Sequence, residues 1–72
     1  GHPALGIWKY LNGYTREIVE DGLVTLRLGT NVIWKRRCIS KSDNEFVLEG
    51  NLVHKLIGNT LDIEGKYQAV RE

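Results

Sequence analysis

The sequence predicts a small all-β domain, either an antiparallel meander barrel or a strongly curled sheet of about six to eight short strands. Turn signals rich in Gly, Asn and Asp recur along the chain, most of them six to nine residues apart. This spacing suits strands and leaves almost no room for helices, which usually need roughly 8–20 residues. Between the signals, apolar and polar residues alternate or β-branched and aromatic residues cluster, as is typical of strands.

The turn signals differ in strength. Asn12-Gly13 and Asp21-Gly22 predict two-residue hairpin turns of type I′, which require positive φ at both central residues. Five weaker signals follow at residues 29–31, 42–44, 49–51, 58–59 and 64–65. The single proline, Pro3, precedes the first expected strand and interrupts no pairing.

We expect strands at residues 5–11, 15–20, 23–28, 32–41, 45–49, 52–57, 60–64 and 66–71. Alternation fixes the register where one face is buried, as for Val24, Leu26 and Leu28, which share one side. Segment 15–20 has no clean alternation, so both a strand and a helical turn stay open for it. A barrel hides the unpaired edges of such a meander most simply, whereas an open sandwich would need a partner to cover them.

The length of 72 residues predicts a single domain. We assign residues 1–3 to a tag remnant and leader, because the initial Gly-His pair is typical of a cleaved expression tag, and residues 4–72 to the β domain. Cys38 is the only cysteine and excludes an internal disulfide. With His2 set aside, Cys38 and His54 are too few ligands for a metal site, and no cofactor is expected.

The charge balance argues against nucleic acid and membranes as partners. Ten Lys and Arg residues against nine Asp and Glu residues give a net charge of +1, which creates no strong field for nucleic acid or an anionic membrane. No apolar run approaches the ~20 residues of a membrane helix, and no signal peptide is recognised. A lone thiol fits a reducing compartment, so we expect the protein in the cytoplasm.

Gly6-Ile7-Trp8 at the start of the first expected strand resembles the Gly-x-Trp signature of lipocalin-like meander barrels. Asp21-Gly22 and the second tryptophan, Trp34, are in keeping with this resemblance. The resemblance implies a barrel in which the first tryptophan closes one end and the open end holds a small apolar ligand. Because this chain is about half as long as a typical lipocalin, we expect its short strands to fill the interior with side chains. Trp8 is then a core residue, and the resemblance carries over the architecture rather than ligand binding.

Lys35-Arg36-Arg37, next to Trp34, is the one local run of positive charge. Cations beside aromatic residues are typical of barrels that bind single-stranded nucleic acid. Consecutive strand residues point to opposite faces, however, so these three cations line one groove only if a bulge intervenes. We therefore expect either a bulge near 35–37 or a strand that projects beyond the barrel and forms a dimer contact.

His54 shares one side of its expected strand with Leu52 and Leu56. A histidine in this setting is a hydrogen-bonded core or rim residue unless an acid, nucleophile or substrate lies within reach. A Cys38–His54 pair would need a third orienting residue and an oxyanion loop, and the sequence has no pattern for either. The carboxylates fall near turns or on outer faces rather than in a cleft. We therefore expect no enzymatic activity and assign no catalytic residue.

The first expected strand is apolar on both faces, with Trp8 and Tyr10 on one side and Leu5, Ile7 and Leu11 on the other. An isolated barrel needs only one apolar face, so a second subunit is expected to cover the other. The sequence thus favours a non-enzymatic binding or interaction domain that acts as a homo-oligomer. The alternatives are a carrier of a small apolar ligand and a single-stranded nucleic-acid binder. The candidate ligand or interface residues are Trp8, Tyr10, Trp34, Lys35, Arg36, Arg37 and His54.

Overall fold

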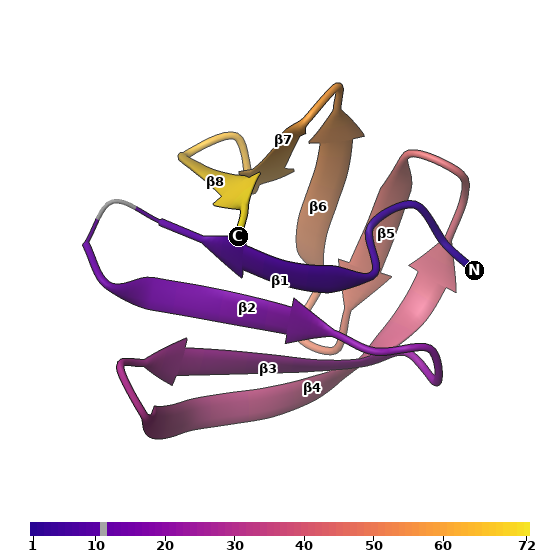
Figure 1. Cartoon of the computed structure of the whole chain (residues 1–72). Coiled ribbons are helices and arrows are strands. Elements are labelled where there is room, and N and C mark those ends of the chain that lie inside the picture. The colour runs from indigo at the N-terminus through magenta and orange to yellow at the C-terminus, as the bar shows by residue number, and fades with distance from the viewer. Residues whose placement is uncertain (11) are drawn as a thin grey trace.

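The computed structural model describes residues 1–10 and 12–72, and in this part of the chain eight strands follow one another. They are β1 (Gly6–Lys9), β2 (Tyr14–Ile18), β3 (Leu23–Leu28), β4 (Asn31–Lys41), β5 (Glu45–Leu48), β6 (Leu52–Ile57), β7 (Thr60–Ile63) and β8 (Tyr67–Arg71). Each strand pairs antiparallel with the next, and β1 also pairs with β8, which closes the barrel (Figure 1). The predicted fold class is confirmed, and closure excludes the open sandwich.

The expected strands agree closely with the observed ones, and segments 23–28 and 52–57 match β3 and β6 at both ends. Residues 15–18 of segment 15–20 lie in β2 and residues 19–20 lead into the next turn, so the alternative of a helical turn there is wrong. Leu11, expected on the outer face of the first strand, lies outside the described residues. The described residues form strands and turns, and no helix among them is long and apolar enough to cross a membrane.

The turn at Asp21-Gly22 differs from the predicted type. Only Gly22 has positive φ, at 89°, whereas a type I′ turn needs positive φ at Asp21 as well. The Gly22 N–H donates to the carbonyl of Val19 at 2.9 Å, and the Val19 N–H donates to that of Leu23 at 3.1 Å. These bonds define a three-residue loop with a type I turn and a positive-φ glycine. Positive φ at two successive central residues occurs instead at Glu64 (58°) and Gly65 (70°).

The barrel interior is filled by side chains, as its short strands predicted. The largest fully buried side chains are Trp8, Val24, Leu48, His54, Leu61 and Ile63. The indole N–H of Trp8 donates to the carbonyl of Ala4 at 2.8 Å, so this buried donor is satisfied. Trp8 is therefore a core residue, as predicted.

β4 pairs with β3 along its first part and with β5 along its second part (Figure 1). Its pairing skips Ile33 before Trp34 and Ile39 after Cys38, so bulges flank the central stretch. The expected bulge near 35–37 is therefore misplaced, and the strand does not project unpaired from the barrel. Each extra residue bends the strand locally, which lets β4 pass from one partner to the next.

Candidate functional site

One row of paired residues crosses four strands and faces the barrel interior. Trp8 of β1 pairs with Arg16 of β2, Arg16 with Leu26 of β3, and Leu26 with Trp34 of β4. Directly paired residues of neighbouring strands lie on the same face of a sheet. Since Trp8 is fully buried, the register directs Arg16 and Trp34 inward as well.

Arg16 is a charged residue that is only 6% exposed. Its Nε donates to the hydroxyl of Tyr10, and its Cζ lies 4.8 Å from the centre of the Trp34 ring. Its Nη1 is buried and has no hydrogen-bond partner among the described residues. Burial raises the pKa of Tyr10 above its ordinary 10.0 despite the opposing influence of Arg16. The phenol is therefore neutral at pH 7 and provides Arg16 with no counter-charge.

Trp34 lies next to a second guanidinium, that of Arg36. Arg36 pairs with the buried Val24, and its Cζ lies 4.9 Å from the centre of the Trp34 ring. Its Nη1 donates to the carbonyl of Glu49 at 3.0 Å. Arg36 and Trp34 are half-buried, so this side of the cluster is within reach of solvent. One indole thus contacts two cations.

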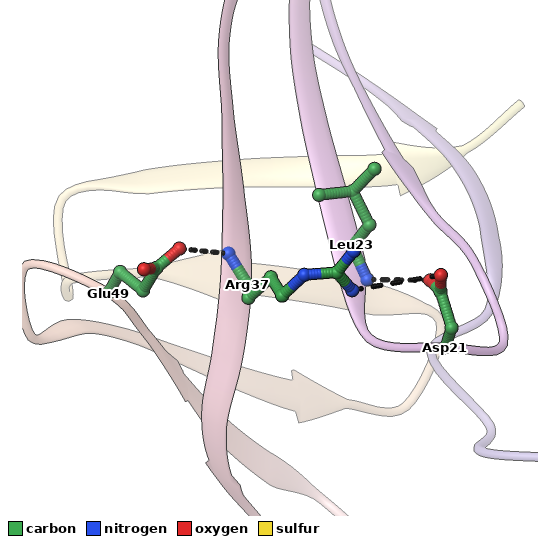
Figure 2. A network of polar contacts seen from close by, with 4 residues as sticks. All are labelled: Asp21, Leu23, Arg37 and Glu49. Carbon is green, nitrogen blue, oxygen red and sulfur yellow. Dashed lines mark hydrogen bonds and ion pairs between the residues drawn. The ribbon is translucent and has the colours of Figure 1, made fainter.

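Lys35 and Arg37 lie on the opposite, exposed side of β4. Figure 2 shows Arg37 between two acidic residues: its guanidinium forms an ion pair with Asp21 at 3.6 Å, and its backbone N–H donates to the Glu49 carboxylate at 2.7 Å. Asp21 also accepts a bond from the Leu23 N–H at 3.1 Å. The structure therefore separates the cationic run, with Trp34 and Arg36 inside and Lys35 and Arg37 outside.

His54 is fully buried on the interior face of β6, as its sequence context predicted. Its ring stacks on Phe46 with 4.8 Å between ring centroids, and Nδ1 bonds to the carbonyl of Leu52 at 3.1 Å. Burial, and then the charge of Arg16, lowers its pKa from 6.5 to about 4. The imidazole is thus neutral at pH 7, and because a carbonyl only accepts, Nδ1 carries the proton. Nε2 is then a buried acceptor without a described partner.

A pocket of about 340 Å³ lies beside the N-terminal segment, between the β2–β3 turn and the end of β4. Its lining is His2, Leu5, Ile18, Val19, Glu20, Asp21, Gly22, Val24, Cys38, Ile39, Ser40, Lys41 and Phe46. Ile18, Val24 and Phe46 belong to the hydrophobic core, so the core forms the pocket's apolar floor. Cys38 lines the pocket and donates its S–H to the carbonyl of Ser40 at 3.2 Å.

The structure brings together only part of the predicted set. Tyr10 and Trp34 meet around Arg16. Trp8 instead packs beneath Arg71, whose Cζ lies 4.2 Å from its ring centre, and His54 lies against Phe46. None of the seven predicted candidates lines the pocket.

Sequence reasoning missed Arg16 as an interior residue, missed the contact of the exposed Arg71 with Trp8, and missed the pocket entirely. Arg16 has the same strand parity as Ile18, and that signal would have placed it inside. The pocket combines residues from four separate segments, and no local motif marks them.

Comparison of the chain with known protein families, curated proteins and solved structures gave no match. Residues 1–10 and 12–72 also contain no group of three or more His, Cys, Asp or Glu residues arranged to hold a metal ion.

Proposed function

We propose that this chain is a small non-enzymatic binding domain that takes a neutral, mostly apolar ligand in the pocket beside its N-terminal segment. The observation that supports this function is a pocket of about 340 Å³ with the core residues Ile18, Val24 and Phe46 in its lining. Sites for small molecules are typically concave, largely apolar and ~300–1,000 Å³ in volume. The pocket lies at the lower end of that range, which favours a compact ligand.

The distribution of polar groups supports a binding role over catalysis. The charged lining residues Glu20, Asp21 and Lys41 are exposed, so they fit a polar rim above an apolar floor. Cys38 lines the pocket, whereas His54 does not. A nucleophilic pair needs its thiol and its base within hydrogen-bond reach, and here His54 bonds to its own strand at Leu52 instead.

The test uses n-octanol as a neutral apolar probe, titrated into ¹⁵N-labelled protein. We expect saturable shifts of backbone amides around the pocket, those of Gly22, Val24 and Ile39 among them. Ile39→Trp is the diagnostic variant, because Ile39 lines the pocket and is 58% exposed, so a larger side chain there narrows the entrance without entering the core. Val32→Trp is its control, since Val32 is 51% exposed and does not line the pocket.

The affinity for octanol should fall by about tenfold or more in Ile39→Trp. A change of about one methylene in the fit of an apolar pocket already alters affinity by roughly 10–200-fold, and tryptophan adds more than that to the pocket wall. Val32→Trp should bind as the parent does. Shifts that stay linear with octanol concentration, or equal weakening in both variants, would refute the pocket as the site.

A second candidate function is self-association through a row of residues on the outside of the barrel, in which Val70 and Ile57 are exposed apolar residues. Val70 of β8 lies between Lys9 of β1 and Thr60 of β7, and Thr60 pairs in turn with Ile57 of β6. Ile57 is 62% exposed and Val70 54% exposed. Neighbouring exposed apolar side chains are typical of surfaces that bind another protein, and we propose a second copy of this chain as the occupant.

Sedimentation equilibrium over a range of protein concentrations tests this association. We expect the average mass to rise with concentration and Val70→Glu to keep the chain monomeric. Val32→Glu alters a similarly exposed apolar residue on β4, which β2 and β3 separate from Lys9, and should associate like the parent. A monomer at every concentration would eliminate the homo-oligomer.

A further inference from the structure

In the described strands, the charged residues with the strand parity of the core are all cations, of which Arg16 is buried, Arg36 is half-buried, and Lys41 and Arg71 are exposed. Each of these cations pairs with a buried residue and so lies on the same face as that residue. Arg16 and Arg71 pair with Trp8, Arg36 pairs with Val24, and Lys41 pairs with Phe46. The strand carboxylates Glu17, Glu45 and Asp62 have the opposite parity and face outward. Charge is therefore segregated across the barrel wall although the net charge of the chain is only +1.

Within residues 1–10 and 12–72, these inward arginines form no ion pair. The ion pairs there are Arg27–Glu17 at 2.9 Å and Arg37–Asp21 at 3.6 Å, and both use outward-facing arginines. Arg71 donates instead to the carbonyls of Leu5 and Pro3. Arg16 keeps an unpaired Nη1 although it is 6% exposed. The Arg16 guanidinium has a neutral hydrogen-bond partner and an aromatic ring beside it but no counter-ion among the described residues. A buried charge without a counter-ion destabilises a fold, so Arg16 favours an anionic partner.

We propose that Arg16 and Arg36, with the Tyr10 hydroxyl beside Arg16, bind a compact oxyanion of the phosphate or phosphomonoester class at the Trp34 side of the barrel. Both guanidiniums lie against one indole, at 4.8 and 4.9 Å from its ring centre, so the two positive charges border the same ring. Guanidinium presents paired N–H donors that match phosphate oxygens. Because Arg36 is half-buried, an anion can reach the site from solvent. Arg16 is buried, so its positive charge is poorly hydrated and attracts an anion more strongly.

The same geometry favours a small anion over a nucleic-acid strand. A strand binder stacks bases on open aromatic faces and follows a continuous row of cations. The Trp34 ring is already engaged by two guanidiniums, and Lys35 and Arg37 point away from Arg36. The oxyanion site also shares no residue with the apolar pocket, so either proposal can fail without the other.

Inorganic phosphate is the probe, titrated at constant ionic strength against chloride. Binding is followed by tryptophan fluorescence and by the unfolding temperature. We expect a saturable fluorescence change and a higher Tm in phosphate, because a ligand that binds only the folded state stabilises it. Chloride at equal ionic strength should produce neither effect.

Arg36→Gln and Arg37→Gln form a matched pair of neighbouring residues on opposite faces of β4. Arg36→Gln should weaken phosphate binding by about tenfold or more, as expected for the loss of a hydrogen bond to a charged group. Arg37→Gln should bind as the parent does. Both variants should fold, because both side chains are partly or fully exposed.

Equal weakening in the two variants would overturn the site and indicate diffuse attraction to surface charge. Absence of a saturable phosphate response in the parent would overturn it as well. An oligothymidylate that binds the parent more tightly than phosphate, and that loses affinity equally in both variants, would replace the small-anion site with a nucleic-acid surface.

Discussion

Phe46 stacks on His54 with 4.8 Å between their ring centroids and 20° between their planes. The two residues face each other across the β5–β6 pair, and both are buried. A protonated imidazole in this position would lose its hydration and lie near the positive charge of Arg16. Burial and the charge of Arg16 therefore hold His54 in its neutral form, which links the stability of the barrel to pH.

The free energy of unfolding should decrease as the pH falls from about 6.5 to 4. Burial, followed by Arg16, lowers the pKa of His54 from 6.5 to about 4 in the folded chain. In that window the unfolded chain binds a proton that the folded chain does not, so acidification favours unfolding. Above pH 6.5 both states are neutral, and below about 4 both are protonated. The total loss is about 3 kcal/mol by proton linkage, measured by urea unfolding at a series of pH values.

His54→Phe provides the comparison, because it keeps an aromatic ring against Phe46 and removes the titrating group. Other titrating groups contribute to the pH profiles of both the parent and the variant. The difference between the two pH profiles therefore isolates His54. Profiles that run parallel from pH 7 to 4 would show that His54 takes up its proton equally in both states, contrary to its burial.

Trp8→Ala should reduce the free energy of unfolding by roughly 3–5 kcal/mol, the usual range for a large buried aromatic residue. Trp8 is fully buried, and its indole N–H donates to Ala4. Small domains have only about 5–15 kcal/mol in total, so we expect partial unfolding at room temperature. Lys9→Ala, at the next, outward-facing position, is the control and should change stability by less than about 0.5 kcal/mol. Circular-dichroism melts distinguish the two, and similar melts would contradict the burial of Trp8.

The strand order was predictable because local chemistry marks each reversal. Glycine or asparagine occurs wherever the backbone adopts positive φ, except at Glu64. Val24 and Leu26, and likewise Leu61 and Ile63, then alternate with outward residues in register with the core. Turn position and alternation together determine which strands pair and which face is buried.

The interior site was not predictable from the same signals. Arg16 occupies a core position of β2, so it removes the apolar alternation on which the strand assignment depended. The bulges at Ile33 and Ile39 depend on how β4 changes partner, which is a property of the closed barrel rather than of local sequence. The pocket likewise exists only after the N-terminal segment meets β4.

Gly22→Val should destabilise the domain by roughly 1–3 kcal/mol, the range for a residue held in a sparsely populated backbone conformation. Gly22 has φ of 89°, and an added Cβ would lie 3.5 Å from the Cβ of Cys38. Space is thus adequate for the first carbon, and the penalty comes from backbone strain, which is greatest for β-branched residues. Glu20→Ala alters the same loop without requiring positive φ and should unfold like the parent. Equal urea midpoints for Gly22→Val and Glu20→Ala would contradict the observed turn.

Arg16→Met should leave the unfolding temperature unchanged or raise it, and it should abolish the phosphate effect. Methionine fills much of the same interior volume without a charge that needs a counter-ion, and apolar replacement of buried charges is often neutral or stabilising. The variant loses the hydrogen bond to Tyr10, but Tyr10 is only half-buried, so water can take the place of Arg16. If the only role of Arg16 were to stabilise the fold, its replacement would lower the unfolding temperature. If Arg16→Met instead lowered the free energy of unfolding by more than about 1 kcal/mol and still bound phosphate, Arg16 would be a structural residue that holds Tyr10 and Trp34 together.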